Sequence, residues 1–289
     1  MSVNRTYSDH SDANLFRICA WIKYTAVSIH RQIYAAVKLL SFSGAVIIPS
    51  GQKSTYTNPD AKTYSLPDLA DASTVRKFHE SLPQYTPTPL VPLVDLAERF
   101  RVKRIVVKDE GNRLGLPSFK ILGALWGTYR AIASRLDLPL NISLDDLLGA
   151  AKDASIKLFA ATDGNHGRAV AYMAKLLDLP VEIFVPRAVS NHARELIVKE
   201  GADVTVVEGD YDESVRSAAD KTATTPGGLL IQDMSFEGYD DIPSWIVDGY
   251  STMLREIDVQ LEDRNLKPTI IITPFSMSSL TAVVVTHAK

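Results

Sequence analysis

From about Leu90 onward, short apolar segments alternate with longer segments in which apolar residues recur at helical spacing. The short segments are rich in Val and Ile, and they predict strands over residues 101–111, 156–162, 181–186, 203–209, 227–233 and 267–274. The longer segments predict helices over residues 118–136, 167–178, 191–202, 211–223 and 242–261. This order admits few folds, because strand–helix–strand units close through right-handed crossovers into parallel sheets. We therefore expect an α/β protein whose sheets are largely parallel and covered on both faces.

The composition excludes several classes of protein. The chain has 289 residues, 46% of them hydrophobic, with a formal net charge of -3. A near-neutral balance argues against a nucleic-acid-binding protein, which would carry a basic face. The single cysteine, Cys19, cannot build a disulfide framework. A reducing compartment is expected, and we predict a cytoplasmic protein.

The first sixty residues differ from the rest of the chain. No acidic residue occurs between Asp12 and Asp60, whereas five basic residues and many apolar ones do. This pattern is typical of a transit peptide or an interfacial helix, and organelle targeting is the alternative to the cytoplasm. The plainer interpretation, an atypical extension over residues 1–60, is favoured. Its longest uncharged run, Leu39 to Gln52, has 14 residues, fewer than the roughly 20 that span a bilayer.

One candidate site follows the predicted strand 156–162. In "AATDGNHGRAVAY" the strand ends at Thr162, and a helix is expected to start near Arg168. Glycines allow close backbone approach, and the free N–H groups of a helix start bind a carboxylate or phosphate. Asp163 would repel such an anion, so it is either a functional carboxylate or a helix N-cap. His166 has no second ligand at a metal spacing, which favours a hydrogen-bonding role and predicts no metal.

Lys120 is the second candidate, because it lies in an apolar run just after the turn "GNRLGL". A helix lysine commonly lays its stem on the core while its amine reaches water. The functional alternative is a buried amine that forms a Schiff base. Composition alone does not choose between them.

Three motifs together resemble diaminopropionate ammonia-lyases. They are "KDEGNRLGLPSFKILGA" at residues 108–124, "ATDGNHGRAVAY" at 161–172 and "IQDMSFEGYDDIPSWIVDGY" at 231–250, preceded by "YTPTPL" from Tyr85 to Leu90. That family belongs to the pyridoxal-phosphate enzymes of fold type II, with the threonine dehydratases and the tryptophan synthase β-subunit. The similarity extends from about Leu82 to about Thr273. An aspartate before the glycine in "TDGNHG" separates this pattern from that of generic dehydratases.

The resemblance implies an architecture and partners. It implies two largely parallel three-layer α/β domains in a catalytic region over residues 61–274. About residues 118–228 would form the smaller domain, and the flanks would form a large domain that is incomplete here. The substrate would be a small amino acid, and a complete member would be a homodimer.

The resemblance also implies a role for each matching residue. Lys120 would attach pyridoxal phosphate, Phe119 would support its ring, and Asn165 would hydrogen-bond its 3'-hydroxyl. Backbone N–H groups of the turn that contains Thr162, Gly164 and His166 would hold the substrate carboxylate. Two further positions would take the Cα proton from opposite faces of the substrate, one for each isomer.

These two general bases would be Asp163 for the D-isomer and Asp233 for the L-isomer. The products would be pyruvate and ammonia. The plain alternative for Asp233 is a polar cap at a strand end. A serine or threonine dehydratase is a weaker alternative, because a hydroxyl leaving group does not call for Asp163.

The resemblance fails at both ends of the chain. The family continues after its last strand with a glycine-rich loop for the cofactor phosphate, whereas this chain has no glycine after Gly249. Residues 275–289 form an atypical tail, in which "LTAVVVTHAK" is strand-like. A catalytically impaired fragment or pseudoenzyme is therefore the alternative to an active lyase.

Overall fold

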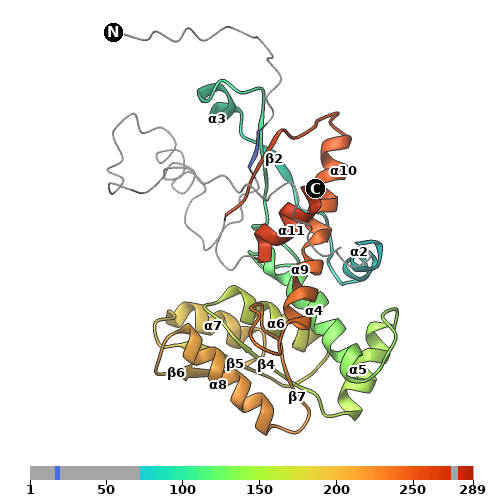
Figure 1. The fold of residues 1–289 in the computed structure, drawn as a ribbon, viewed down its shortest axis with the longest axis vertical. Coiled ribbons are helices and arrows are strands. Elements are labelled where there is room, and N and C mark those ends of the chain that lie inside the picture. The colour runs from blue at the N-terminus through green and yellow to red at the C-terminus, as the bar shows by residue number, and fades with distance from the viewer. Residues whose placement is uncertain (1–16, 20–71, 275–278, 289) are drawn as a thin grey trace, which may run out of the picture.

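The computed structural model describes residues 17–19, 72–274 and 279–288. Within these ranges the elements form two four-stranded sheets, with helices between and around them. Figure 1 shows the two sheets in separate parts of the molecule, with α4 (Lys120–Arg135) and α9 (Asp241–Gly249) between them. None of the described helices combines the length and the apolar character needed to cross a membrane.

The first sheet has the strand order β6-β5-β4-β7 and is parallel throughout. Its strands are β4 (Lys157–Ala161), β5 (Val181–Pro186), β6 (Asp203–Val207) and β7 (Gly228–Leu230). The crossover helices are α6 (Asn165–Leu176), α7 (Asn191–Lys199) and α8 (Tyr211–Thr224). The predicted alternation of strands and helices is confirmed over this whole stretch.

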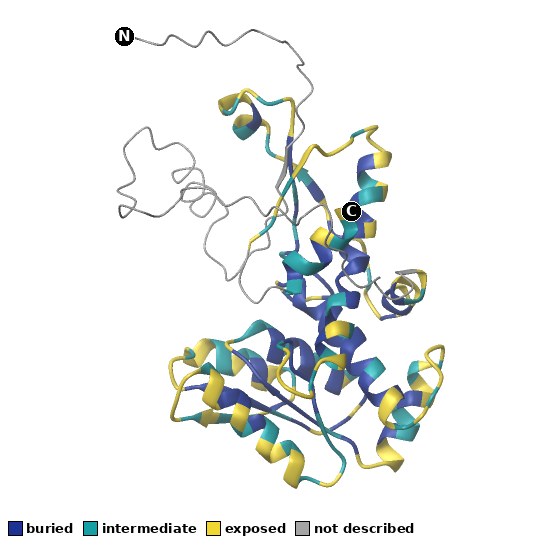
Figure 2. Cartoon of the chain, viewed as in Figure 1, coloured by how far each residue is buried: buried dark blue, intermediate teal, exposed yellow. Residues whose placement is uncertain are grey.

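Helices cover both faces of this sheet, which makes it the middle of three layers. Side chains alternate across a strand. In β4, Leu158 and Ala160 join the main core with α4 and α6, whereas Phe159 and Ala161 join a smaller core with α8. Figure 2 shows β4, β5 and α4 among the most continuously buried parts of the molecule.

The second sheet has the order β2-β3-β1-β8. Its strands are β2 (Leu90–Pro92), β3 (Ile105–Lys108), β1 (Arg17–Cys19) and β8 (Ile270–Ile272). β2 runs antiparallel to β3, and the other two pairings are parallel. β1 comes from the segment that the sequence suggests is an extension, yet it pairs between β3 and β8. The rest of residues 1–60 lies outside the described residues.

The close approach of α4 and α9 depends on glycine. A Cβ on Gly123 would lie 2.4 Å from the Tyr250 ring, and a Cβ on Gly127 would lie 2.5 Å from Ile246. Glycines at these positions let the two helix backbones pack closely, and this packing holds the start of α4 against the second half of the chain. Lys120 is the first residue of α4.

Two predictions about the secondary structure of the C-terminal part of the chain are wrong. The helix expected over residues 242–261 is two helices, α9 and α10 (Ser251–Glu262), which are separated at Tyr250. Gly249 lies against Gly123 and Trp126 at this break, so packing on α4 decides where α9 ends. The terminal run is a helix rather than a strand, α11 (Ser279–Ala288). Its residues Leu280, Val283 and Val284 are buried at helical spacing, and tertiary packing overrides their β propensity.

Three short helices were not expected from the sequence. They are α2 (Ala72–Glu80), α3 (Val94–Arg99) and α5 (Leu144–Asp153). α5 does carry a recognisable start, since the Ser143 hydroxyl accepts a hydrogen bond from the Asp146 N–H and two aspartates lie in its first turn. The tail residues 275–278 lie outside the described residues.

Candidate active site

Lys120 is buried, and its amine is held by a carboxylate. The residue is 7% exposed, and its Nζ forms an ion pair and a hydrogen bond with Asp233 Oδ2. The Ser118 hydroxyl accepts a hydrogen bond of 3.2 Å from the Lys120 N–H, which ties the helix start to the preceding turn. The surface interpretation of Lys120, with its amine in water, is therefore wrong.

Asp233 follows β7 and is 3% exposed. Burial by itself would raise its pKa, but His166, Lys120 and their polar contacts outweigh burial and lower the pKa of this carboxyl. Burial lowers the pKa of His166, although the negative charge of Asp233 opposes this. The Lys120 ammonium, which bonds Asp233 directly, also favours the ionised carboxylate.

His166 lies in the first turn of α6, beside this ion pair. Its Nε2 donates a hydrogen bond of 2.8 Å to the Ile231 carbonyl, and that acceptor assigns the proton to Nε2. Nδ1 faces Asp233 Oδ2 at 3.8 Å. Neither His166 Nδ1 nor Asp233 Oδ1, both buried, has a hydrogen-bond partner among the described residues.

The turn before α6 is held by Thr162. Its hydroxyl oxygen accepts hydrogen bonds from the Gly164 N–H at 2.9 Å and from the Gly167 N–H at 3.0 Å. Gly164 has φ of 153°, which only glycine adopts readily. The Gly164 N–H, expected to hold the substrate carboxylate, is thus used within the turn.

Asp163 is exposed in this turn and is not the helix N-cap, which is Gly164. The N-cap interpretation of Asp163 is wrong, and α6 begins three residues earlier than expected, at Asn165. Although Asp163 is exposed, partial desolvation of its carboxyl by the surrounding protein is the main cause that raises its pKa. The positive charge of Lys120 opposes this effect, and the negative charge of Asp233 adds to it. The mutual effects show that all three groups share one electrostatic environment.

Phe119 and Asn165 flank these charged groups in sequence. Phe119 is 4% exposed and packs on Tyr250 with ring centroids 4.9 Å apart. Asn165 is half-buried at the first position of α6. The start of α4, the start of α6 and the segment after β7 therefore bring Lys120 and His166 to the same carboxylate, that of Asp233.

The sequence did not predict a hydrogen-bond network around Gln232, the residue that precedes Asp233. Gln232 accepts a hydrogen bond from the Ala161 N–H at 3.0 Å and donates one to the Tyr211 hydroxyl at 2.6 Å. The Tyr239 hydroxyl accepts from the Gln232 N–H and donates to the Leu230 carbonyl. The segment "QDMSFEGY" carries two of these residues, Gln232 and Tyr239, but nothing in its sequence indicates their hydrogen bonds.

A family model described as "Pyridoxal-phosphate dependent enzyme" matches residues 82–289, which include every residue of this site. The chain belongs to this family. Its fold is fold type II, as the solved structures of similar proteins show. Among the described residues, no group of three or more His, Cys, Asp or Glu side chains is placed to hold a metal ion.

Curated proteins that are similar to this chain include diaminopropionate ammonia-lyases. The Escherichia coli enzyme is 34% identical over 213 residues, which are 74% of this chain and 53% of the relative. The Salmonella typhimurium enzyme is 36% identical over 197 residues, 66% of this chain and 48% of the relative. The chain thus spans about half the length of the curated relatives it matches.

Solved structures agree with this comparison. The Escherichia coli enzyme in complex with D-serine superposes with a TM-score of 0.70 at 33% identity, covering 74% of this chain and 55% of that one. A threonine deaminase from T.th., at 21% identity and a TM-score of 0.59, covers 77% of this chain and 61% of that one and shares the fold.

The residues present fit the family cofactor, pyridoxal phosphate. A buried lysine amine is the group that attaches it, and the two buried polar atoms without hydrogen bonds, Asp233 Oδ1 and His166 Nδ1, lie beside that amine. Nothing after Gly249 offers a glycine turn for its phosphate, because no glycine occurs there. The residues therefore fit the part of the cofactor that bonds to lysine, and the fit does not extend to its phosphate.

Proposed function

We propose that the complete protein removes ammonia from 2,3-diaminopropionate and yields pyruvate and a second ammonia after hydrolysis. The observation that carries the proposal is the buried Lys120–Asp233 pair in a chain 34% identical to a diaminopropionate ammonia-lyase. One molecule of water balances the reaction, since diaminopropionate and water contain the atoms of pyruvate and two molecules of ammonia.

Lys120 would hold the cofactor, which supplies an electron sink for the negative charge left at the substrate Cα. Asp233, ionised and pointing at Lys120, would accept the Cα proton of the L-isomer. Asp163 would do so for the D-isomer from its exposed position in the turn. Each carboxylate would need to lie within about 3 Å of the proton it takes.

Other residues would bind and orient. Phe119, held by Tyr250, would support the cofactor ring, and Asn165 would hydrogen-bond its 3'-hydroxyl. The first turn of α6, with His166, would receive the substrate carboxylate, because the Thr162 and Gly164 N–H groups are already bonded within the protein.

We also propose a division of the chain, from which β1 (Arg17–Cys19) of the second sheet lies apart. Residues 61–274 would be the catalytic region, with about 118–228 as the smaller domain, and the first sheet lies within or just beyond that range. A homodimer and a cytoplasmic location are predictions for the complete protein.

Two alternatives are kept. A serine or threonine dehydratase is supported by the rat L-serine dehydratase/L-threonine deaminase, 32% identical over 111 residues, but these cover 38% of this chain. A catalytically impaired fragment or pseudoenzyme is the second alternative. Release of ammonia and pyruvate from diaminopropionate, compared with serine and threonine, separates the three in a complete protein.

The assignment of Lys120 is tested directly on the 289 residues. Borohydride reduction in the presence of pyridoxal phosphate should add the cofactor mass to the peptide that contains Lys120. Lys120→Arg should abolish this label, whereas the control Lys157→Arg, on β4, should keep it. Label on another lysine with Lys120 unmodified would overturn the assignment.

A further inference from the structure

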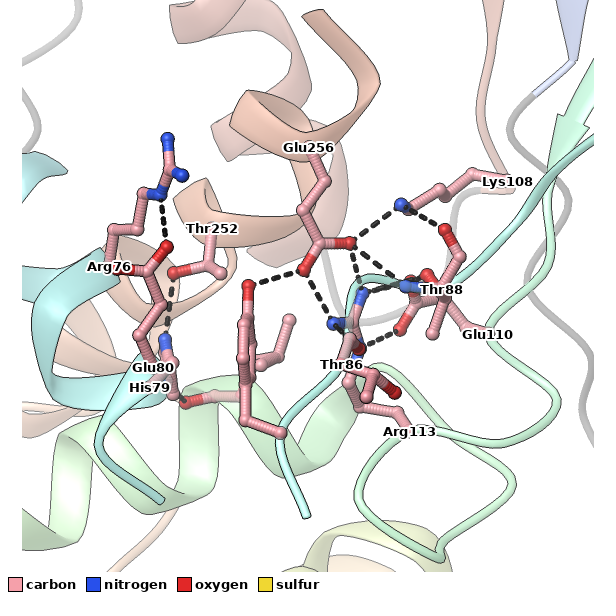
Figure 3. Close-up of polar contacts among 12 residues, drawn as sticks. Arg76, His79, Glu80, Thr86, Thr88, Lys108, Glu110, Arg113, Thr252 and Glu256 are labelled. Carbon is pink, nitrogen blue, oxygen red and sulfur yellow. Dashed lines mark hydrogen bonds and ion pairs between the residues drawn. The ribbon is translucent and has the colours of Figure 1, made fainter. Parts of the chain in front are cut away.

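A buried cluster of four charged side chains lies where β3, the loop after it and α10 meet, away from the groups discussed so far. We call it the Arg113 cluster, and it comprises Lys108, Glu110, Arg113 and Glu256, with side-chain exposures of 0–6%. Figure 3 shows the four side chains converging, with Glu256 reaching down from its helix toward the others.

Arg113 is the centre of the cluster and binds two carboxylates at once. Its Nε and Nη2 donate to Glu110 at 2.8 and 2.6 Å. Its Nη1 and Nη2 donate to Glu256 at 2.6 and 2.8 Å. Nη2 also donates to the Thr88 hydroxyl at 2.8 Å. The planar guanidinium matches two carboxylates in a fixed orientation, which a lysine ammonium does not.

The remaining members complete the cluster. Lys108 Nζ lies 2.6 Å from Glu256, and the Tyr85 hydroxyl donates to Glu256 at 2.7 Å. Two cations face two anions, so the buried charge is balanced. Burial alone would raise the pKa of Glu256, but Arg113 and Lys108 outweigh it and lower the pKa, so this carboxyl is ionised.

Stability does not account for such a cluster. Apolar side chains of similar volume commonly match or exceed the stabilisation that a buried ion pair provides, because charges lose their hydration when they are buried. What a fully paired cluster supplies is directional bonding that admits one arrangement of the three segments.

The cluster lies at the base of the loop that leads to Lys120. Arg113 and Leu116 exchange backbone hydrogen bonds of 2.8 and 2.9 Å, which close a tight turn with Leu114 and Gly115 at positive φ. Two residues further, Ser118 accepts the Lys120 N–H. At the C-terminal end of the loop, the Phe119 ring packs on the Tyr250 ring. Tyr250 directly precedes α10, the helix that carries Glu256.

We propose that Arg113, which is hydrogen-bonded to Glu110 and Glu256, is a positioning residue. It fixes the position of the Lys120 amine through the loop 113–119. This inference rests on the proposed role of Lys120. Loss of the bidentate contacts would leave the loop attached at Phe119 but free to shift at Arg113, and a shift of 1 Å in a reacting group costs on the order of 10²-fold in rate.

The test uses Arg113→Lys, which keeps the positive charge and removes the planar guanidinium that binds both carboxylates. We expect the rate at which pyridoxal phosphate and borohydride label Lys120 to fall by on the order of 10²-fold. We also expect a changed pH profile of the visible absorbance of the attached cofactor. The matched control is Lys157→Met, which removes a partly buried ion pair with Glu182 in the other sheet and should leave both readouts unchanged.

Circular dichroism and a denaturant midpoint show whether each variant is folded. A folded Arg113→Lys that labels Lys120 at the unaltered rate with the same pH profile would overturn the inference. If Arg113→Lys does not fold, Thr88→Val decides, because it removes the hydroxyl that bonds both Arg113 and Glu110 and leaves the four charges in place. Slower labelling then supports the inference and unchanged labelling overturns it. Failure of the unaltered chain to label Lys120 would instead count against the proposed function.

Discussion

At the scale of single residues, the site depends on contacts that no local pattern contains. Lys120 and Asp233 are 113 positions apart in sequence and form a buried ion pair. Their burial strengthens the attraction and makes each charge costly to leave alone. Asp163, by contrast, is exposed, so its role is less constrained by the fold.

The two aspartates should differ in their substrate isomers. In a complete, active protein, Asp163→Asn is expected to lower turnover mainly of D-diaminopropionate and Asp233→Asn mainly that of the L-isomer. A general base contributes about 10²–10⁴-fold, and that is the expected loss in kcat. Ammonia release from each isomer measures it, and equal small losses on both isomers from either variant would contradict the division.

Gly167 should not tolerate a side chain. A Cβ there would lie 2.4 Å from Thr162 Cγ2 and 2.7 Å from Ile183 Cγ2. Gly167→Ala is therefore expected to lower the free energy of unfolding by about 1–3 kcal/mol through overpacking. Gly149→Ala is the matched control, since nothing lies within 4 Å of its Cβ, and it should stabilise α5 by roughly 0.5–1 kcal/mol. Denaturant unfolding measures both, and a Gly167→Ala protein as stable as the control would contradict the packing argument.

At the scale of elements, one buried histidine joins three helices. His79 of α2 donates from Nε2 to the Leu122 carbonyl of α4 at 2.9 Å, and its Nδ1 accepts from the Thr252 hydroxyl of α10 at 2.7 Å (Figure 3). Burial lowers the pKa of His79 to about 3. The imidazole is thus neutral in the folded protein, as these two bonds require.

This contact predicts a pH dependence of stability. In the unfolded chain the histidine pKa is about 6.5, so between about pH 6.5 and 3 the unfolded state binds the extra proton. Stability should fall as pH falls through this window, by at most about 1.4 kcal/mol per pH unit from this group. Unfolding free energies of the unaltered protein and His79→Gln, measured from pH 7 to 4.5, should have different slopes. Parallel curves would show that His79 does not titrate in this way.

At the scale of the whole molecule, the second sheet ends in an exposed strand. β8 is the last strand in the order β2-β3-β1-β8 of the described residues, and its Ile270 and Ile272 are 36% and 37% exposed. Apolar residues on an edge strand favour pairing with other chains. Ile272→Lys should therefore raise the soluble fraction of the 289-residue protein without changing the labelling of Lys120. Size-exclusion chromatography measures the first, and an unchanged aggregate fraction would contradict the argument.

The 289 residues by themselves are expected to turn over diaminopropionate slowly or not at all. The cofactor phosphate is a dianion that glycine-rich turns neutralise through close backbone N–H groups, and "TPFSMSSL" carries large side chains where such a turn has none. Weak cofactor retention after dialysis and negligible ammonia release should result. Turnover on the order of 1 s⁻¹ or faster by a soluble monomer would contradict this expectation.

The alternation of strands and helices from β4 to β7 could be predicted from the residues alone, as could the glycine-containing turns before Lys120 and in "TDGNHG", because periodicity and glycine placement are local properties. The sequence also carried the family resemblance, since Lys120, Asp163 and Asp233 stand in recognisable motifs. Three other features could not be predicted in this way and follow from packing: Lys120 is buried against Asp233, α9 ends before Tyr250, and "LTAVVVTHA" is helical. The Arg113 cluster likewise joins segments more than 140 residues apart, as the separation of 143 between Arg113 and Glu256 shows. Such outcomes depend on which distant surface a segment meets, because burial and partner charges rather than local propensity set their free energy.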